Sequence, residues 1–137
     1  MTYQLQPIPA QFVGQAWKEG AHMLAKACDA SGGEITGDQL KMLLMRGERS
    51  LLRIAKDGQC AGWATVRIDQ LPNVRVLHIT DLYAPGGHWQ ACFDLLADMA
   101  RANGCTQMRC CAGAAQQRLY MRHLPWQPVY TTLKVDL

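Results

Sequence analysis

The pattern of apolar and polar positions predicts ten elements in the order strand, two helices, three strands, helix, strand, helix, strand. Residues 3–8 alternate weakly, which predicts an edge strand. Across residues 10–28 the apolar residues recur at three- and four-residue steps, which predicts one helix with one buried face. A second helix is expected after Thr36, a typical helix-capping residue, and should end near Gly47.

The middle of the chain predicts an antiparallel meander. Strands are expected over residues 50–55 and 60–68, and Asp57-Gly58 lies between them. Asp-Gly favours a hairpin because both turn positions require a positive φ. After a turn at residues 71–73, a third strand is expected over residues 74–83.

The C-terminal half predicts a strand–helix–strand unit followed by one more helix and strand. The helix covers residues 88–103, the following strand residues 106–111, the last helix residues 113–124 and the closing strand residues 129–135. Two strands joined through a helix are parallel, with a right-handed crossover. The chain is therefore expected to be a single α/β domain over residues 1–137, with a mixed sheet and helices on both faces. Ligands tend to bind where strand order changes in such sheets, here after residue 83.

Composition narrows the class of protein. With 137 residues, 49% hydrophobic and 18% charged, the chain can bury one ordinary core. The net charge of +3 is spread among interleaved signs, so we expect no nucleic-acid partner. No long apolar run or secretory signal is visible, so we expect a cytoplasmic protein without a membrane partner. The six cysteines show no metal-ligand spacing, so we expect reduced thiols and no metal site.

The element order, the Gly62 strand after the hairpin and residues 119–130 (LYMRHLPWQPVY) resemble the GNAT superfamily of N-acetyltransferases. Within it, the compact length looks most like small GNAT-like proteins of tailed phages. The resemblance implies acetyl-CoA as donor and a primary amine, on a small molecule or a protein, as acceptor. It also implies a GNAT-like fold, with an antiparallel meander and one parallel junction.

The family's pyrophosphate loop, Gln/Arg-x-x-Gly-x-Gly/Ala, falls on residues 84–89 (APGGHW), where Gly87 alone meets the pattern. Pro85 has no N–H to donate. Trp89 either fills the space for the pyrophosphate or packs into the core, and its place on the apolar face of the helix favours the core. Backbone N–H groups at the helix start are still expected to bind phosphate. The residues concerned are Gly86, Gly87, His88 and Trp89.

By position, Tyr120 matches the family's general acid; the alternative is a surface tyrosine on the late helix. Asp81 is a candidate base or amine-binding group, because an acid in an apolar strand either faces a cleft or needs a partner. The alternative is a solvated carboxylate at the strand end. Backbone groups of Leu82, Tyr83 and Ala84 are expected to contact the donor and polarise its carbonyl.

Three functions remain open. The first is an active acetyltransferase. The second is a catalytically inactive GNAT-fold protein that binds a protein partner, for example as a virion component of a phage. It draws support from Ala84, in place of Gln or Arg, and from Trp89. The third is an unrelated α/β binding module.

Overall fold

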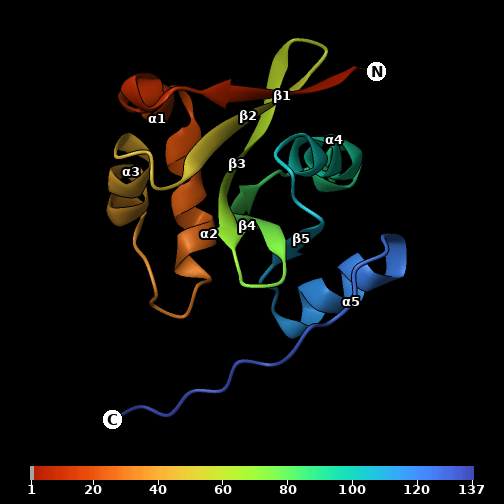
Figure 1. The fold of residues 1–137 in the computed structure, drawn as a ribbon. Coiled ribbons are helices and arrows are strands. Elements are labelled where there is room, and N and C mark those ends of the chain that lie inside the picture. Colours follow the sequence, from red (N-terminus) through yellow and green to blue (C-terminus); the bar gives the residue numbers. More distant parts are fainter. Residues whose placement is uncertain (1) are drawn as a thin grey trace.

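In the computed structural model, which describes residues 2–137, five strands form one sheet in the order β1-β2-β3-β4-β5 (Figure 1). The first four strands pair antiparallel with their neighbours, and β4 pairs parallel with β5. The predicted meander and parallel crossover are therefore confirmed. The strands are β1 (Tyr3–Ile8), β2 (Ser50–Lys56), β3 (Gln59–Gln70), β4 (Arg75–Tyr83) and β5 (Gln107–Cys110).

Local sequence signals explain several element boundaries. Asp57 and Gly58 both have positive φ, 51° and 82°, and turn β2 into β3. Thr36 forms a capping box with Gln39 at the start of α3 (Gly37–Met45). The later helices, α4 (His88–Ala102) and α5 (Ala114–His123), begin within one residue of the predicted positions. None of the helices in residues 2–137 is long and apolar enough to cross a bilayer.

The single helix predicted over residues 10–28 is wrong, because the chain breaks at Gly20. It forms four short pieces: η1 (Ala10–Phe12), α1 (Val13–Glu19), η2 (Ala21–Leu24) and α2 (Ala25–Asp29). Gly20 has a φ of 145°, which no helix contains, and a Cβ there would lie 3.2 Å from the Trp63 indole nitrogen. The glycine lets the chain turn over the Trp63 ring.

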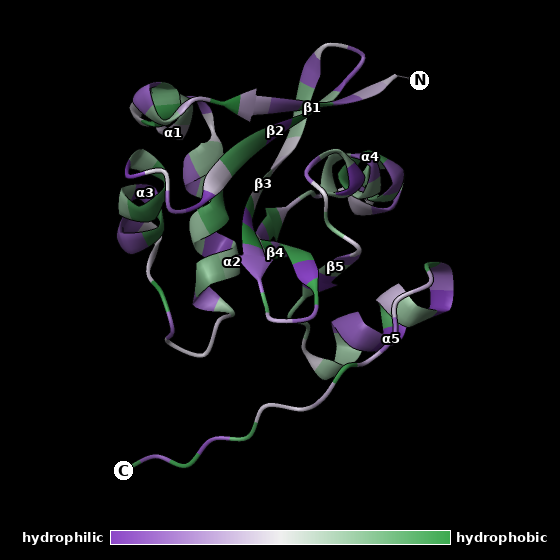
Figure 2. Ribbon diagram, in the orientation of Figure 1, coloured by the Kyte–Doolittle hydropathy of each residue, from purple (hydrophilic) through white to green (hydrophobic). Residues whose placement is uncertain are grey.

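Helices cover both faces of the sheet. The first three helices lie on one side and α4 on the other (Figure 1). Green and purple alternate around α3 and α4 in Figure 2, as expected for helices with one apolar side. Two buried clusters result. One holds Leu24, Leu40, Leu44, Leu51 and Trp63 under α1–α3, and the other holds Leu52, Ile54, Leu77, Cys92 and Leu96 under α4.

The closing strand predicted over residues 129–135 is wrong. After α5 the chain runs as an extended tail away from the sheet (Figure 1), and Val129 and Leu133 are 60% and 87% exposed. The segment has the alternating pattern of a strand (Figure 2), but no strand lies beside it in the described residues. Strand propensity has no effect without a partner for the backbone groups.

A substitution at Gly62 tests how closely β3 must approach the end of β4. A Cβ there would collide with the Tyr83 carbonyl oxygen and lie 3.0 Å from Ala84 Cα. We expect Gly62→Ala to lower the free energy of unfolding by about 1–3 kcal/mol, measured by urea denaturation. At Gly14, in α1, no atom of the described residues lies within 4 Å of the position that a Cβ would take, apart from its chain neighbours and the backbone of its own helix. Gly14→Ala should therefore stabilise the protein by roughly 0.5–1 kcal/mol, and equal effects of the two substitutions would contradict the close approach.

Candidate active site

The parallel pair of strands parts halfway along β4. The pairing joins Val76–Ile79 to Gln107–Cys110, whereas β4 continues to Tyr83. A register shift between Thr65 and Val66 of β3 leaves Thr80 as the extra residue of a β-bulge. A bulge bends its strand and increases the local twist, so β4 leaves β5 from this residue on. The backbone of residues 80–83 then faces a cleft on the β5 side.

This cleft has a volume of about 490 Å³ and brings together residues that lie far apart in the sequence. Of the predicted site residues, it is lined by Asp81, Leu82, Tyr83, Trp89 and Tyr120. The rest of its wall comes from α2 and the loop that follows it, from Ile79 and Thr80 of β4, from Phe93 and Leu96 of α4, from residues 110–113, and from α5 and the segment after it. Ala84, Gly86, Gly87 and His88 do not line it; they form the turn above it, at the start of α4.

Asp81 is buried, with 8% of its surface exposed, and it is held by three side chains. The Thr65 hydroxyl donates to Oδ2 at 2.7 Å, and Arg49 Nη1 donates to the same oxygen at 3.1 Å. Within residues 2–137, the partner of Oδ1 is the Cys28 thiol, which donates to it at 3.8 Å. The carboxylate therefore joins α2, β3 and the residue before β2 to the bulge of β4.

Two thiols in this region remain protonated at neutral pH. Burial, reinforced by the negative charge of Asp81, raises the pKa of Cys28 to about 11. Burial also raises the pKa of Cys110 to about 11. Neither thiol is a nucleophile, since the thiolate is the reactive form.

Tyr120 projects from α5 into the cleft and packs on Trp89. The two ring centroids lie 4.8 Å apart with an interplanar angle of 55°. Burial raises the pKa of Tyr120, and the nearby Cys110 adds to this effect. The phenol therefore keeps its proton at neutral pH and can donate it.

Trp89 lies in the cleft, although its place on the apolar face of the helix had favoured the core. It is half-buried and belongs to neither buried cluster. The first turn of α4 faces α5 here, so the apolar side of this turn meets Tyr120. Of the two alternatives from the sequence, the structure favours a ring that occupies space near the helix start.

The turn before α4 uses both of its glycines. Gly86 and Gly87 have φ values of 84° and 80°, in the left-handed region, and Gly87 caps the helix. The side chain of His88 points to β1, where Nδ1 lies 2.8 Å from the Tyr3 hydroxyl oxygen. What the turn offers a ligand is therefore the backbone N–H groups of the first helical turn.

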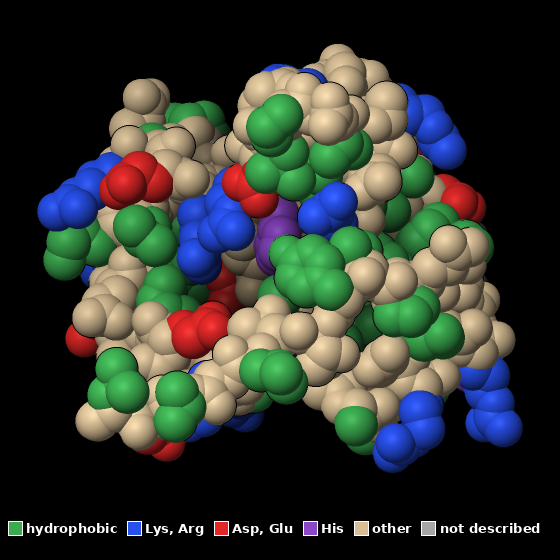
Figure 3. Space-filling model, turned by 60° about the horizontal axis from the view of Figure 1, so that its bottom comes forward, with side chains coloured by type: hydrophobic (Ala, Val, Ile, Leu, Met, Phe, Trp, Pro, Cys, Tyr) green, Lys and Arg blue, Asp and Glu red, His purple; other side chains and the backbone are tan. Residues whose placement is uncertain are grey.

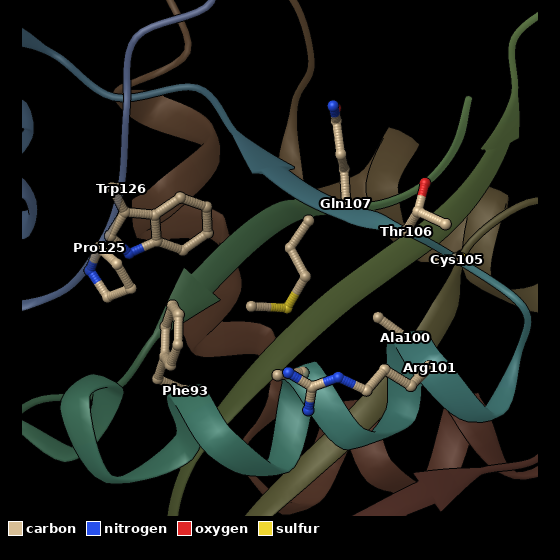
Figure 4. A pocket seen from close by; sticks show the side chains of 10 residues that line it. Phe93, Ala100, Arg101, Cys105, Thr106, Gln107, Pro125 and Trp126 are labelled. Carbon is tan, nitrogen blue, oxygen red and sulfur yellow. The ribbon is translucent and has the colours of Figure 1, made fainter. Parts of the chain in front are cut away.

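A second cavity, of about 290 Å³, lies between α4, β5 and the segment after α5 (Figure 4). Phe93 and Trp126 line both cavities and meet edge to face, with ring centroids 5.6 Å apart. This pair therefore stands between the cleft and the second cavity. Among residues 2–137, no group of side chains is arranged to hold a metal ion.

Sequence reasoning missed the partners of Asp81: Arg49, Thr65 and Cys28. The one signal was the acid itself, because a carboxylate in an apolar strand requires a partner when it is buried. The pattern could not say which cation would supply the charge. Arg49 comes from a turn 32 positions earlier and reaches Asp81 only through the fold.

Solved structures with the same fold include acetyltransferases. A ribosomal-protein-alanine N-acetyltransferase from Brucella melitensis biovar Abortus 2308 has 14% identity and a TM-score of 0.66 over 99% of this chain and all of its own. A predicted acetyltransferase with acetyl-CoA from Clostridium acetobutylicum has 12% identity and a TM-score of 0.66, over 98% of this chain and 96% of its own.

An aminoglycoside acetyltransferase from an uncultured soil metagenomic sample, in complex with sisomicin, has 10% identity and a TM-score of 0.67, over 98% of this chain and 96% of its own. No protein-family model and no curated protein sequence matches the chain. At these identities the likeness establishes the fold, and the fold is that of the GNAT acyltransferases.

His78 lies on β4 before the bulge, and its protonation can be followed through stability. Burial, with Arg67 as the next cause, lowers its pKa from 6.5; Asp69 opposes this shift, and Arg49 and Arg109 add to it. As the pH falls below 6.5, the unfolded chain therefore binds the proton first. The contribution of His78 to stability is complete above that pH and is lost as the pH falls toward the lower folded-state pKa.

We expect His78→Gln to flatten the decline in the free energy of unfolding between pH 7 and pH 5, measured by urea denaturation at each pH. His22→Gln, which removes an imidazole at an exposed position, is the matched control. If the profiles of the His78 variant and the unsubstituted protein have the same slope, the burial of a neutral His78 is wrong.

Proposed function

We propose that this chain is an N-acetyltransferase that moves the acetyl group of acetyl-CoA to a primary amine. The observation that carries the proposal is the parting of β4 and β5 in a GNAT fold. Because the strands part, the backbone of residues 80–83 has no partner in β5. Tyr120, which carries a proton, lines the same cleft as this backbone. The cleft volume of about 490 Å³ lies in the usual range of small-molecule sites.

The residues present fit the parts of acetyl-CoA. The pyrophosphate would lie on the N–H groups of residues 86–89, at the positive end of the α4 dipole. The extended thiol arm would follow the free edge of β4, where the backbone of Leu82, Tyr83 and Ala84 can donate to it and polarise the thioester carbonyl. A neighbour of the same fold carries acetyl-CoA, which supports this assignment.

Acetyl transfer requires a proton for the departing thiolate and an uncharged amine to attack the thioester. The amine nitrogen bonds to the thioester carbon and gives up one proton to Asp81 or to water. The carbon–sulfur bond breaks, the departing thiolate takes the proton of the Tyr120 phenol, and the phenolate regains a proton from water. We assign Asp81 the role of base or amine-binding carboxylate, because it lies in the stretch of β4 that has no β5 partner and lines the cleft. Its Oδ1 is the oxygen available to the amine, since Arg49 and Thr65 both bind Oδ2.

One observation favours a second function. Trp89 packs on Tyr120 in the cleft, and the turn lacks the Gln or Arg of the family's loop. A GNAT-fold protein that binds a protein partner without catalysis, such as a component of a phage particle, would have no need to keep this space open. Binding of the donor separates the two functions.

Acetyl-CoA binding can be located with two exposed cysteines. Cys111 lines the cleft, whereas Cys60 lies on β3 outside it. We expect calorimetric titration to show saturable binding of acetyl-CoA, and saturating acetyl-CoA to slow the alkylation of Cys111 by iodoacetamide but not that of Cys60. Absence of binding at millimolar concentration would favour the non-catalytic function, and equal protection of both thiols would contradict the location.

Tyr120→Phe removes the proposed proton donor and keeps the ring that packs on Trp89. We expect kcat to fall about 100-fold or more, with unchanged affinity for acetyl-CoA, measured by steady-state kinetics and calorimetry. Tyr130, 76% exposed in the tail, provides the matched control, and Tyr130→Phe should leave kcat unchanged. A Tyr120 variant with full kcat would remove this tyrosine from the mechanism.

A further inference from the structure

A row of basic side chains crosses the sheet just before the strands part. The register places Arg67 of β3 opposite His78 of β4, and His78 opposite Arg109 of β5. Residues directly opposite one another project from the same face of a sheet. Arg49 directly precedes Ser50, which pairs with Val66, and so lies at the end of the row beside Arg67. We call these four residues the arginine row.

The arginine row lies on the face that α1–α3 only partly cover. Leu77 and Ile79 of β4 pack toward α4, so His78 between them points to the opposite face. Asp81 projects from that same face, where it meets Cys28 of α2. All four side chains of the row are half-buried. Figure 3 shows this kind of arrangement, a recessed histidine with Lys and Arg side chains on both sides and an acidic side chain nearby.

The charges of the row do not cancel. Arg67 pairs with Asp69, with Nε 3.0 Å from Oδ1, and Arg49 pairs with Asp81. In the described residues Arg109 pairs with no carboxylate; its Nε donates to the Gln107 amide oxygen at 3.1 Å. One arginine charge is therefore left over, on a guanidinium whose fork geometry suits a carboxylate or phosphate.

We propose that the arginine row binds a carboxylate or phosphate group of the amine acceptor, with Arg109 as its main contact. This inference rests on the proposed acetyl transfer and adds the class of acceptor. His78 lies three residues before Asp81 on the same strand, so the oxyanion would sit roughly 10 Å from the reacting amine. A chain of about three extended amino acids spans this distance.

The phosphates of acetyl-CoA do not account for the row. The start of α4, where we place the pyrophosphate, follows the far end of β4, after Tyr83. It also belongs to the helix that covers the other face of the sheet, against Leu77 and Ile79. Donor and acceptor anions would thus approach β4 from opposite faces and at opposite ends.

Anion binding can be measured without acetyl-CoA. We expect inorganic phosphate or acetate, titrated separately, to shift the His78 imidazole signals in NMR spectra saturably and to raise the pKa of His78, because a bound anion offsets the arginine charges. The anion that saturates at lower concentration identifies phosphate or carboxylate as the group recognised. Arg109→Gln should abolish the effect, whereas Arg101→Gln, at an exposed position on α4, should keep it.

A kinetic comparison tests the link to the acceptor. If a carboxylate is recognised, triglycine should have a KM about 10-fold or more below that of triglycine amide, and Arg109→Gln should remove this preference. If phosphate is recognised, adding inorganic phosphate should inhibit acetylation of triglycine amide by competition with the acceptor, and Arg109→Gln should relieve it.

The outcomes separate the two proposals. No saturable shift of His78 with either anion overturns the arginine row as an anion site, whether or not acetyl-CoA binds. Saturable binding without acetylation of any amine counts against acetyl transfer and leaves the anion site supported. If triglycine and triglycine amide have the same KM and added phosphate does not inhibit acetylation, the assignment of the row to the acceptor is overturned.

Discussion

The buried carboxylate of Asp81 is the constraint on which the cleft depends. A carboxylate removed from water must be paired and hydrogen-bonded, and removing one partner of such a pair typically costs about 3–5 kcal/mol. Arg49, with a side chain 17% exposed, and Thr65 meet this requirement from two different segments. Because both bind the residue directly after the bulge at Thr80, they hold β4 in the bent course that parts it from β5.

The bulge also decides on which face of the sheet Asp81 lies, because the extra residue Thr80 changes the alternation of side chains after Ile79. Leu77, Ile79 and Leu82 pack toward α4, and His78 and Asp81 project toward the side of α2. A donor that lies along the free edge of the strand and an acceptor that comes from the polar face would then meet at residues 80–83. The geometry that opens the cleft therefore also supplies two separate approaches to it.

The sequence predicted those parts of the fold that local chemistry determines. Asp57-Gly58 fixed the hairpin, Thr36 the start of α3, and the apolar period of residues 88–102 the main helix. The sequence did not predict the helix break at Gly20, because this break depends on a distant contact. The chain passes over the Trp63 ring there. In the site, the strand end and Tyr120 could be placed from the sequence, but the Arg49–Asp81 pair and the arginine row arise from register, which the sequence does not state.

The contact between Trp89 and Tyr120 bears on whether the cleft can still work. An aromatic pair of this kind contributes about 0.5–1.5 kcal/mol beyond the area it buries. A ligand with a dissociation constant of about 1 μM gains roughly 8 kcal/mol on binding. Displacing the ring would therefore cost acetyl-CoA roughly a two- to tenfold loss of affinity, because 1.4 kcal/mol corresponds to a factor of ten. The tryptophan lowers the affinity to be expected of the site without closing it, and the phenol that it covers is the proposed proton donor.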